Sequence, residues 1–237
     1  FVDPGTVVRW SLGLRVAGRS KVESLKTFIG SNYPYTKVEA FTHRIGVVRE
    51  NADEPHEQLV LDPFIDSADL IYDATAEVGI NHLLSDLAAQ RQLPYICVSA
   101  TSGAWGGRLI RVRPGRTVGC WMCHQWAINS GLIPIPRSDP QGEVQPAGCG
   151  DPTFTGSSFD IGTIALAGVR LAIGALQSQV AGGYPDVDWD VAIINLRDET
   201  GRLTNPQWEV FPLERHPSCE NHKAHFSWQS VASTTGG

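Results

Sequence analysis

Two short pairs of metal-binding residue types, far apart in the chain, most constrain how it can fold. Cys120 and Cys123 form a Cys-x-x-Cys pair, and Cys219 and His222 repeat that spacing near the end of the sequence. Tetrahedral zinc takes thiolates and imidazoles at this spacing. Two reduced core thiols, or a redox pair, are the alternatives, but a redox pair opens a helix after the first strand of a thioredoxin-like unit. The order of predicted elements does not supply that context, so we predict a structural zinc site that ties the C-terminal segment to the middle of the chain.

Length, composition and charge indicate a globular protein of one domain. A chain of 237 residues with 42% hydrophobic content can bury a full core, and one domain over residues 1–237 is expected. A net charge of -6 and a pI near 5.6 argue against nucleic-acid binding. No run of about 18 apolar residues occurs, which predicts no membrane span, and residues 1–4 lack the pattern of a signal peptide. Five cysteines favour metal or catalytic use in a reducing compartment, so we expect a cytoplasmic protein.

The order of predicted elements indicates an α/β fold. Strands are predicted over 37–42, 70–73, 94–99, 108–113, 187–196 and 207–211, and helices over 21–32, 56–61, 77–90 and 162–176. The strand–helix–strand order in the middle is typical of parallel pairing. We therefore predict a Rossmann-like, mostly parallel sheet flanked by helices, with a zinc-held crossover loop and a C-terminal antiparallel strand pair that turns at Thr200-Gly201. The helix over 162–176 is apolar on nearly all sides and is expected to be buried against the sheet.

Two cysteines remain once the zinc ligands are assigned. Cys97 lies inside an apolar strand and is interpreted as a small buried hydrophobe. Cys149 lies in a glycine-bordered loop, where a thiol is more accessible. From position alone, Cys149 is either an inert loop cysteine or a nucleophile.

Three charged residues are placed where a nucleotide could bind. Arg9 and Lys21 bracket the first loop, and Asp73 ends a strand at the edge where open α/β sheets bind ligands. Singly, each is typical of surface charge or a helix cap. Together they suit a nucleoside triphosphate, with two cations for the phosphates and an acid for magnesium. The stretch 13–20 has the outline of a phosphate-binding P-loop, but it lacks the lysine and a preceding buried strand.

Several of these stretches together resemble the ubiquitin-activating-enzyme superfamily. This superfamily includes the ThiF- and MoeB-type adenylyltransferases that activate sulfur-carrier proteins for thiamine and molybdopterin synthesis. The stretches are Arg9, Ala17–Glu23, Tyr33-Pro34, Asp73–Thr75, Gly106–Arg108, Cys120-x-x-Cys123, and Cys149 to Gly156 ahead of the apolar helix. The resemblance covers nearly the whole chain, and the order of the motifs is more specific than any one of them.

The resemblance implies adenylation of a C-terminal carboxylate with ATP and Mg²⁺. The implied substrate is a small ubiquitin-like or sulfur-carrier protein that ends in Gly-Gly, with thioester or persulfide transfer afterwards. Cys149 matches the acceptor thiol, and Arg9 and Lys21 match phosphate-contacting positions. The resemblance also supports the four zinc ligands and implies a homodimer, with a conjugating enzyme as a further partner. Acyl-AMP formation turns a poor electrophile into a good one, and cations stabilise the charge that builds during transfer.

Three departures from the family pattern shape the expectations. The glycine-rich loop and first strand would lie before Phe1, which predicts an N-terminally incomplete adenylation domain, completed by an upstream fused domain or a partner subunit. Asp3 is the candidate ribose-binding acid, at a short spacing from Arg9. The family often has Asp-Asn where Ala76-Glu77 stand, so the magnesium role falls to Asp73 or Glu77. The alternative is a non-catalytic, zinc-stapled scaffold or pseudoenzyme subunit that binds a ubiquitin-like partner.

Overall fold

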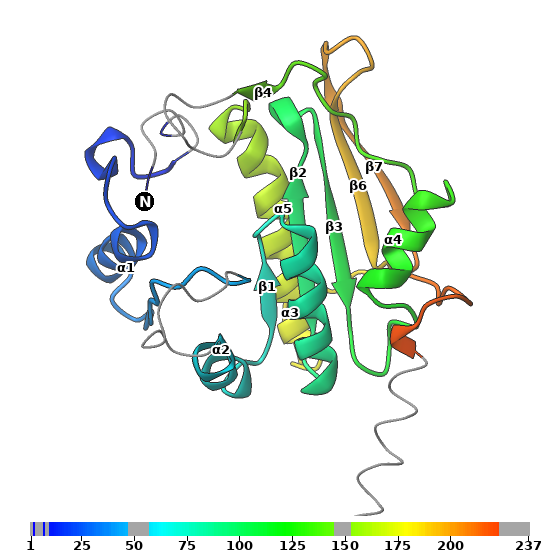
Figure 1. The fold of residues 1–237 in the computed structure, drawn as a ribbon, viewed down its shortest axis with the longest axis horizontal. Coiled ribbons are helices and arrows are strands. Elements are labelled where there is room, and N and C mark those ends of the chain that lie inside the picture. Colours follow the sequence, from blue (N-terminus) through cyan, green and yellow to red (C-terminus); the bar gives the residue numbers. More distant parts are fainter. Residues whose placement is uncertain (1, 3–6, 8–9, 47–56, 145–152, 223–237) are drawn as a thin grey trace, which may run out of the picture.

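A computed structural model describes residues 2, 7, 10–46, 57–144 and 153–222, and these form a sheet with helices on both faces (Figure 1). The five-stranded sheet has the order β1-β2-β3-β6-β7. Its strands are β1 (Ile71–Asp73), β2 (Tyr95–Ala100), β3 (Gly106–Val112), β6 (Val191–Arg197) and β7 (Leu203–Phe211). The predicted α/β class is confirmed.

The sheet is mixed, where the sequence favoured mostly parallel pairing. β1 and β2 are parallel, while β2–β3, β3–β6 and β6–β7 are antiparallel. For β2–β3 and β6–β7 the cause is a short connection, because parallel neighbours need a crossover of a dozen or more residues. Helix α3 (Val78–Gln90) supplies such a crossover between β1 and β2, whereas only residues 101–105 join β2 to β3.

The helices divide between the two faces of the sheet. α3 and α4 (Trp121–Asn129) cover one face, and α5 (Ser158–Gln177) covers the other (Figure 1). α1 (Lys21–Asn32) and α2 (Glu57–Asp66) lie beside the β1 edge. A short antiparallel pair, β4 (Glu143–Val144) with β5 (Thr153–Phe154), precedes α5.

Alternation along the central strands builds a separate core on each face. In β6, Val191 and Ile193 join the core under α3 and α4, while Ala192 and Ile194 join the core under α5. Helix α5 sits very close to the sheet, since a Cβ added at Gly107 would lie 2.7 Å from the Ile164 side chain. Glycine is therefore required there, because any larger residue would push α5 away.

Helix α5 is buried against the sheet, as expected, and this burial is confined to its sheet-facing side. Leu171 is buried, but Leu166 on the outer side is 65% exposed. By length and composition alone, α5 is long and apolar enough to cross a membrane, a test that the core helix of a soluble protein also passes. The prediction of no membrane span stays a prediction.

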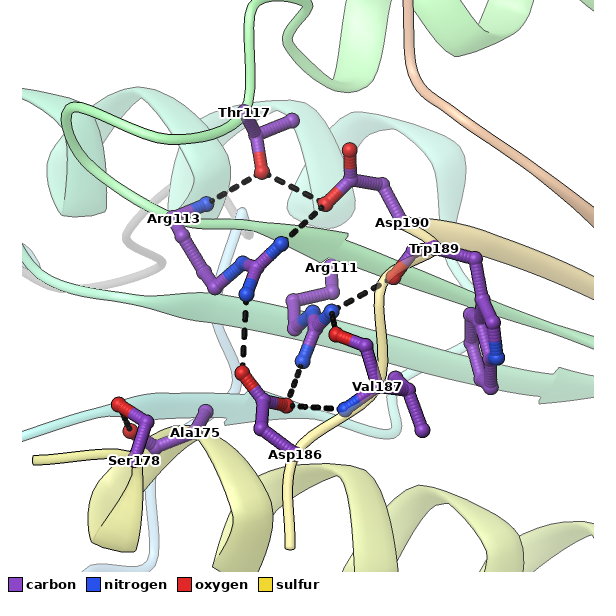
Figure 2. A network of polar contacts seen from close by, with 9 residues as sticks. All are labelled: Arg111, Arg113, Thr117, Ala175, Ser178, Asp186, Val187, Trp189 and Asp190. Carbon is purple, nitrogen blue, oxygen red and sulfur yellow. Dashed lines mark hydrogen bonds and ion pairs between the residues drawn. The ribbon is translucent and has the colours of Figure 1, made fainter. Parts of the chain in front are cut away.

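A buried cluster of arginines and aspartates ties the segment before β6 to β3 (Figure 2). Arg111 is fully buried, pairs with Asp186, and donates to the Val187 and Trp189 carbonyls at 2.9 and 2.6 Å. Arg113 contacts Asp186 at 2.9 Å and Asp190 at 3.3 Å. We call this set the arginine cluster. This cluster was not predicted from the sequence, because its partners stand more than seventy residues apart.

Other predicted elements were confirmed or corrected in detail. The C-terminal strand pair turns where predicted, with Gly201 at φ 83. The weak helix expected over 56–61 is α2, which runs on to Asp66 and contains Pro63. The strand predicted over 37–42 is wrong, since these residues are irregular. Among the described residues no strand lies alongside them, and an unpaired strand is not stable.

Candidate metal centre and nucleotide edge

The four predicted zinc ligands meet at the start of α4. Cys120 is the N-cap of α4 and Cys123 follows one turn later, so both sulfurs lie on the same side of the helix. The Cys120 sulfur lies 3.8 Å from that of Cys123 and 3.6 Å from that of Cys219. Nε2 of His222 lies 3.1 Å from the Cys123 sulfur. All four ligand atoms lie within 4.8 Å of one another, so this group could hold a metal ion.

The donor set and spacing fit a tetrahedral ion. Two sulfurs bound to one zinc at about 2.3 Å stand about 3.8 Å apart at the tetrahedral angle, close to the observed separations. Thiolate and imidazole donors favour zinc over magnesium or calcium, which take oxygen ligands. The pairs stand 99 residues apart, so an ion here would fasten the C-terminal segment to α4.

Contacts around the four ligands hold the C-terminal segment in place. The Gly119 amide donates to the Leu213 carbonyl at 2.8 Å, and the His216 amide donates to the Cys123 sulfur at 3.3 Å. The His216 ring stacks on Trp126 at 4.8 Å between centroids. Sequence reasoning missed His216, although its position three residues before Cys219 was a signal that could have been used. Amide donors to a sulfur stabilise its thiolate form.

The protonation of the cysteines differs by position. The hydrogen bond from Cys120 lowers the pKa of Cys123 to about 4, and the same contact raises the pKa of Cys120. Cys123 is therefore the more acidic of these two thiols. Burial raises the pKa of Cys97 to about 12, so that thiol stays protonated. This agrees with the interpretation of Cys97 as a core residue.

Asp73 lies at the carboxyl end of β1, but its carboxylate faces into the protein. One oxygen accepts from the Thr75 amide and hydroxyl at 2.9 and 2.8 Å. The other accepts from Asn81 at 2.8 Å and from the Tyr95 hydroxyl at 2.7 Å. Asp73 is 1% exposed. Four donors and burial make it an anchor of the loop after β1, and the sequence analysis missed Asn81 and Tyr95 as its partners.

The loop between β1 and α3 presents Glu77 to solvent. Glu77 is the N-cap of α3 and its residue is exposed. Ala76 before it has φ 57, a left-handed conformation that residues with a Cβ seldom adopt and that Asn and Asp tolerate best. Of the two acids expected to bind magnesium, Glu77 is exposed and Asp73 is buried.

The remaining predicted site residues are partly placed. Lys21 is the first residue of α1, and its ammonium lies 5.8 Å from the centre of the Trp10 ring, in cation–π geometry. Asp3, Arg9 and Cys149 lie outside the described residues.

Described residues on both sides of the Cys149 segment are held beside the end of β2. Glu143 and Val144 in β4 pair with Phe154 and Thr153 in β5. The Asp139 amide donates to the Ser102 carbonyl at 2.9 Å. A Cβ at Gly142 would lie 2.6 Å from the Gly103 amide nitrogen, so these backbones touch. The chain therefore enters this segment next to the edge where β1 and β2 end.

Comparison with known proteins places this geometry in one family. The model of the ThiF family matches residues 12–220. The uncharacterised protein y4qC of Sinorhizobium fredii is 38% identical over 92% of this chain, and y4oA of the same organism is 34% identical over 92%. In both cases the chain spans 37% of the relative's length.

Solved structures share the fold at low sequence identity. Escherichia coli MccB with ATP has a TM-score of 0.60 at 15% identity, covering 92% of this chain and 55% of MccB. MccB in complex with N-formylated MccA has a TM-score of 0.61 at 14% identity, covering 92% and 56%. PaaA has a TM-score of 0.56 at 13% identity, covering 88% and 61%. These likenesses support the α/β fold described above.

Proposed function

The chain belongs to the ThiF family, and from this premise we propose that it takes part in ATP-dependent adenylation of the C-terminal carboxylate of a small protein or peptide. The observation that carries the proposal is the family match over residues 12–220. The chain covers 37% of its curated relatives, so the activity belongs to the whole protein and the chain contributes an adenylation domain.

In the proposed first step, a carboxylate oxygen of the substrate attacks the α-phosphorus of ATP and pyrophosphate leaves. Lys21 and Arg9 neutralise the phosphates, Glu77 holds Mg²⁺, and Asp3 binds the ribose. The exposure of Glu77 and the position of Lys21 at a helix start support these roles. Cations beside the phosphates stabilise the charge that builds on them.

In the proposed second step, a sulfur nucleophile attacks the acyl-AMP carbonyl and AMP leaves, which forms a thioester. Cys149 is the proposed acceptor; in the variant for sulfur transfer, a sulfane-sulfur donor first converts Cys149 to a persulfide, whose terminal sulfur attacks the same carbonyl while AMP leaves. The attachment of the flanking residues 139–143 beside the end of β2 supports this role. The thiolate is the reacting form, so the reaction needs Cys149 deprotonated.

The remaining parts of the proposal concern partners and the ion. We take the ion at the four-ligand group to be a structural Zn²⁺, supported by its three thiolates and one imidazole. The substrate is a ubiquitin-like or sulfur carrier ending in Gly-Gly, or a peptide, as the complex of MccB with MccA suggests by analogy. The protein is proposed to be cytoplasmic and homodimeric, with a conjugating enzyme or an upstream domain as further partners.

The full-length protein tests this proposal by ATP–pyrophosphate exchange with Mg²⁺ and a Gly-Gly-ended carrier or a peptide. Glu77→Gln and Lys21→Ala should lower exchange by at least about 100-fold, the scale of a lost charge contact in the transition state. Glu199→Gln and Lys26→Ala are matched controls, since both residues are exposed elsewhere. Unchanged exchange in both site variants would contradict the assigned roles.

A second assay separates adenylation from transfer. Cys149→Ala should keep pyrophosphate exchange and lose the thiol-sensitive conjugate, whereas Cys97→Ala should keep both. A conjugate that survives Cys149→Ala would remove Cys149 from the mechanism.

A non-catalytic scaffold is the second candidate, and Ala76 favours it. An acid is the residue that the family often carries there, and Asp73 beside it is engaged inside the protein. A scaffold would bind the carrier, as measured by calorimetry, without any ATP–pyrophosphate exchange. Exchange above background would exclude this candidate.

A further inference from the structure

A hollow of about 360 Å³ opens between α5, residues 184–189 ahead of β6, and strand β7. We call it the α5–β7 pocket. Its lining is mostly apolar and includes Leu171 of α5 and the indole rings of Trp189 and Trp208. Small-molecule sites in proteins begin at about 300 Å³ and combine apolar walls with a few polar groups. The pocket lies at the small end of that range, which suits a ligand with one aromatic ring and a short chain.

Two tryptophan rings form much of the apolar wall. Trp189 packs on the core under α5, and Trp208 of β7 pairs across the strands with Ile194, which belongs to the same core. The two ring centroids lie 6.4 Å apart, and the ring planes are inclined by 59°. Trp208 is 44% exposed, so part of this aromatic surface is open to solvent. An aromatic ligand placed here can contact both indoles at the centroid distances of about 4.5–7 Å that ring pairs prefer.

The segment on one side of the pocket is held in place by its own hydrogen bonds. The Tyr184 amide donates to the side-chain oxygen of Gln177 at 2.7 Å, at the end of α5. Further along, the arginine cluster fixes the backbone, because Arg111 donates to the carbonyls of Val187 and Trp189 (Figure 2). The pocket is therefore present without a ligand. A preformed pocket favours binding, because no free energy is spent on ordering its walls.

One positive charge in the lining lacks a counter-charge. Nε of Arg170 donates to the Tyr184 hydroxyl at 2.9 Å, which orients the planar guanidinium beside the pocket. Within the described ranges of the chain, no carboxylate lies at ion-pair distance from Arg170. Asp186, the acid in the lining, is already paired with Arg111 and Arg113. The terminal nitrogens of Arg170 are therefore available to a ligand carboxylate, which a guanidinium binds through two parallel hydrogen bonds.

From these contacts we infer that the α5–β7 pocket binds a small aromatic carboxylic acid in its ionised form. The ring of the ligand lies against Trp189 and Trp208, and its carboxylate pairs with Arg170. Tryptophan walls also suit quaternary ammonium ligands, but the charge of Arg170 would repel them. The lining contains none of the four metal ligands and none of the residues assigned to ATP and Mg²⁺. The inference thus goes beyond the proposed function and does not depend on it.

Isothermal titration calorimetry of the full-length protein with 3-phenylpropionate tests the inference, and 3-phenylpropionamide is the matched uncharged ligand. The wild type should bind the acid with a Kd between about 10 µM and 1 mM, as a ligand of this size allows. It should bind the amide at least about 10-fold more weakly, the scale of a hydrogen bond to a charged group. Arg170→Met should bind the acid as weakly as the amide. Arg202→Met is the matched control, because Arg202 is exposed in the turn between β6 and β7, and it should keep the preference for the acid.

A second variant locates the bound ring. Trp208→Ala should weaken binding of the acid and the amide alike, by about 10-fold, because both lose the same aromatic contact. Far-UV circular dichroism and Tm show that each variant is folded. The inference is overturned by no binding of the acid up to about 5 mM, by equal affinity of the wild type for acid and amide, or by a preference that survives Arg170→Met. Tighter binding of phenyltrimethylammonium than of the acid would also overturn it, because the pocket would then be a cation site.

Discussion

The four-ligand metal centre and the arginine cluster perform the same task with different chemistry. Each joins segments distant in sequence, 99 residues apart at the metal centre and 75 residues apart between Arg111 and Asp186. The arginine cluster holds its own counter-charges, so it is complete within the chain (Figure 2). Three cysteines and one histidine hold no such counter-charge, and the Zn²⁺ that we propose there would supply it. With that ion, one attachment would depend on metal supply and the other on charge balance.

The largest effect should come from breaking the metal centre. With zinc bound, Cys120→Ser should lower the free energy of unfolding by at least about 4 kcal/mol, in the range that marks loss of a metal. Stoichiometric metal analysis and urea unfolding measure it, and a chelator should reproduce the loss in the wild type. Cys97→Ser is the control, because Cys97 is a buried cysteine of β2 that is not one of the four ligands and should leave the metal content unchanged.

Removing Asp186 should have the next largest effect. Asp186→Asn leaves the Arg111 guanidinium buried without its counter-charge, which costs about 3–5 kcal/mol. Urea unfolding measures the loss, and it should be the same with and without chelator. Arg91→Met is the control: its two partners Asp62 and Asp66 are largely exposed, so about 0–1 kcal/mol is expected. Equal losses in the two variants would show that burial is not the source of the cluster's strength.

Acid should weaken the arginine cluster selectively. Burial opposes the charge on Asp186, but the Val187 amide and the Arg111 and Arg113 guanidinium groups outweigh it and hold its pKa below the usual value. A carboxyl with a lowered pKa stabilises the fold above its unfolded pKa of about 3.9, and that stabilisation is lost as pH falls through the folded pKa. Unfolding measured between about pH 5 and 2 should therefore show a steeper loss for the wild type than for Asp186→Asn. Parallel curves would contradict this.

The smallest effect concerns a position that neither attachment touches. Ala76→Gly relieves a left-handed backbone that costs a residue with a Cβ about 1–2 kcal/mol, and after about 0.5–1 kcal/mol is subtracted for the entropy of glycine, stability should rise by about 0.5–1 kcal/mol. Ala74→Gly in the same loop has no such strain to relieve and should lower stability by a similar amount. A fall in stability for both would show that the Ala76 conformation is not strained.

The sequence predicted what depends on local pattern and missed what depends on pairing across the fold. The two ligand pairs could be predicted because the spacing within each pair is typical of metal ligands. The structure brings all four ligand residues together. The helix periodicity placed α3 and α5 within a few residues. The contacts of Asn81 and Tyr95 with Asp73, and those of the arginine cluster, could not be predicted from the sequence. A single arginine, asparagine or tyrosine does not show which distant residue it will contact. The antiparallel pairing of most strands was missed for the same reason, because the residues of one strand do not show which other strand it pairs with.

The order of the ligand pairs along the chain has a consequence for its synthesis on the ribosome. Cys120 and Cys123 emerge first, and Cys219 follows only after the 99 residues between Cys120 and Cys219 are made. At about 5–20 residues per second this interval lasts roughly 5 to 20 s. During that time the nascent protein displays two thiols able to capture an ion only loosely or to oxidise. Secure uptake of the proposed ion would thus be a late event, completed only after the chain has been translated past His222.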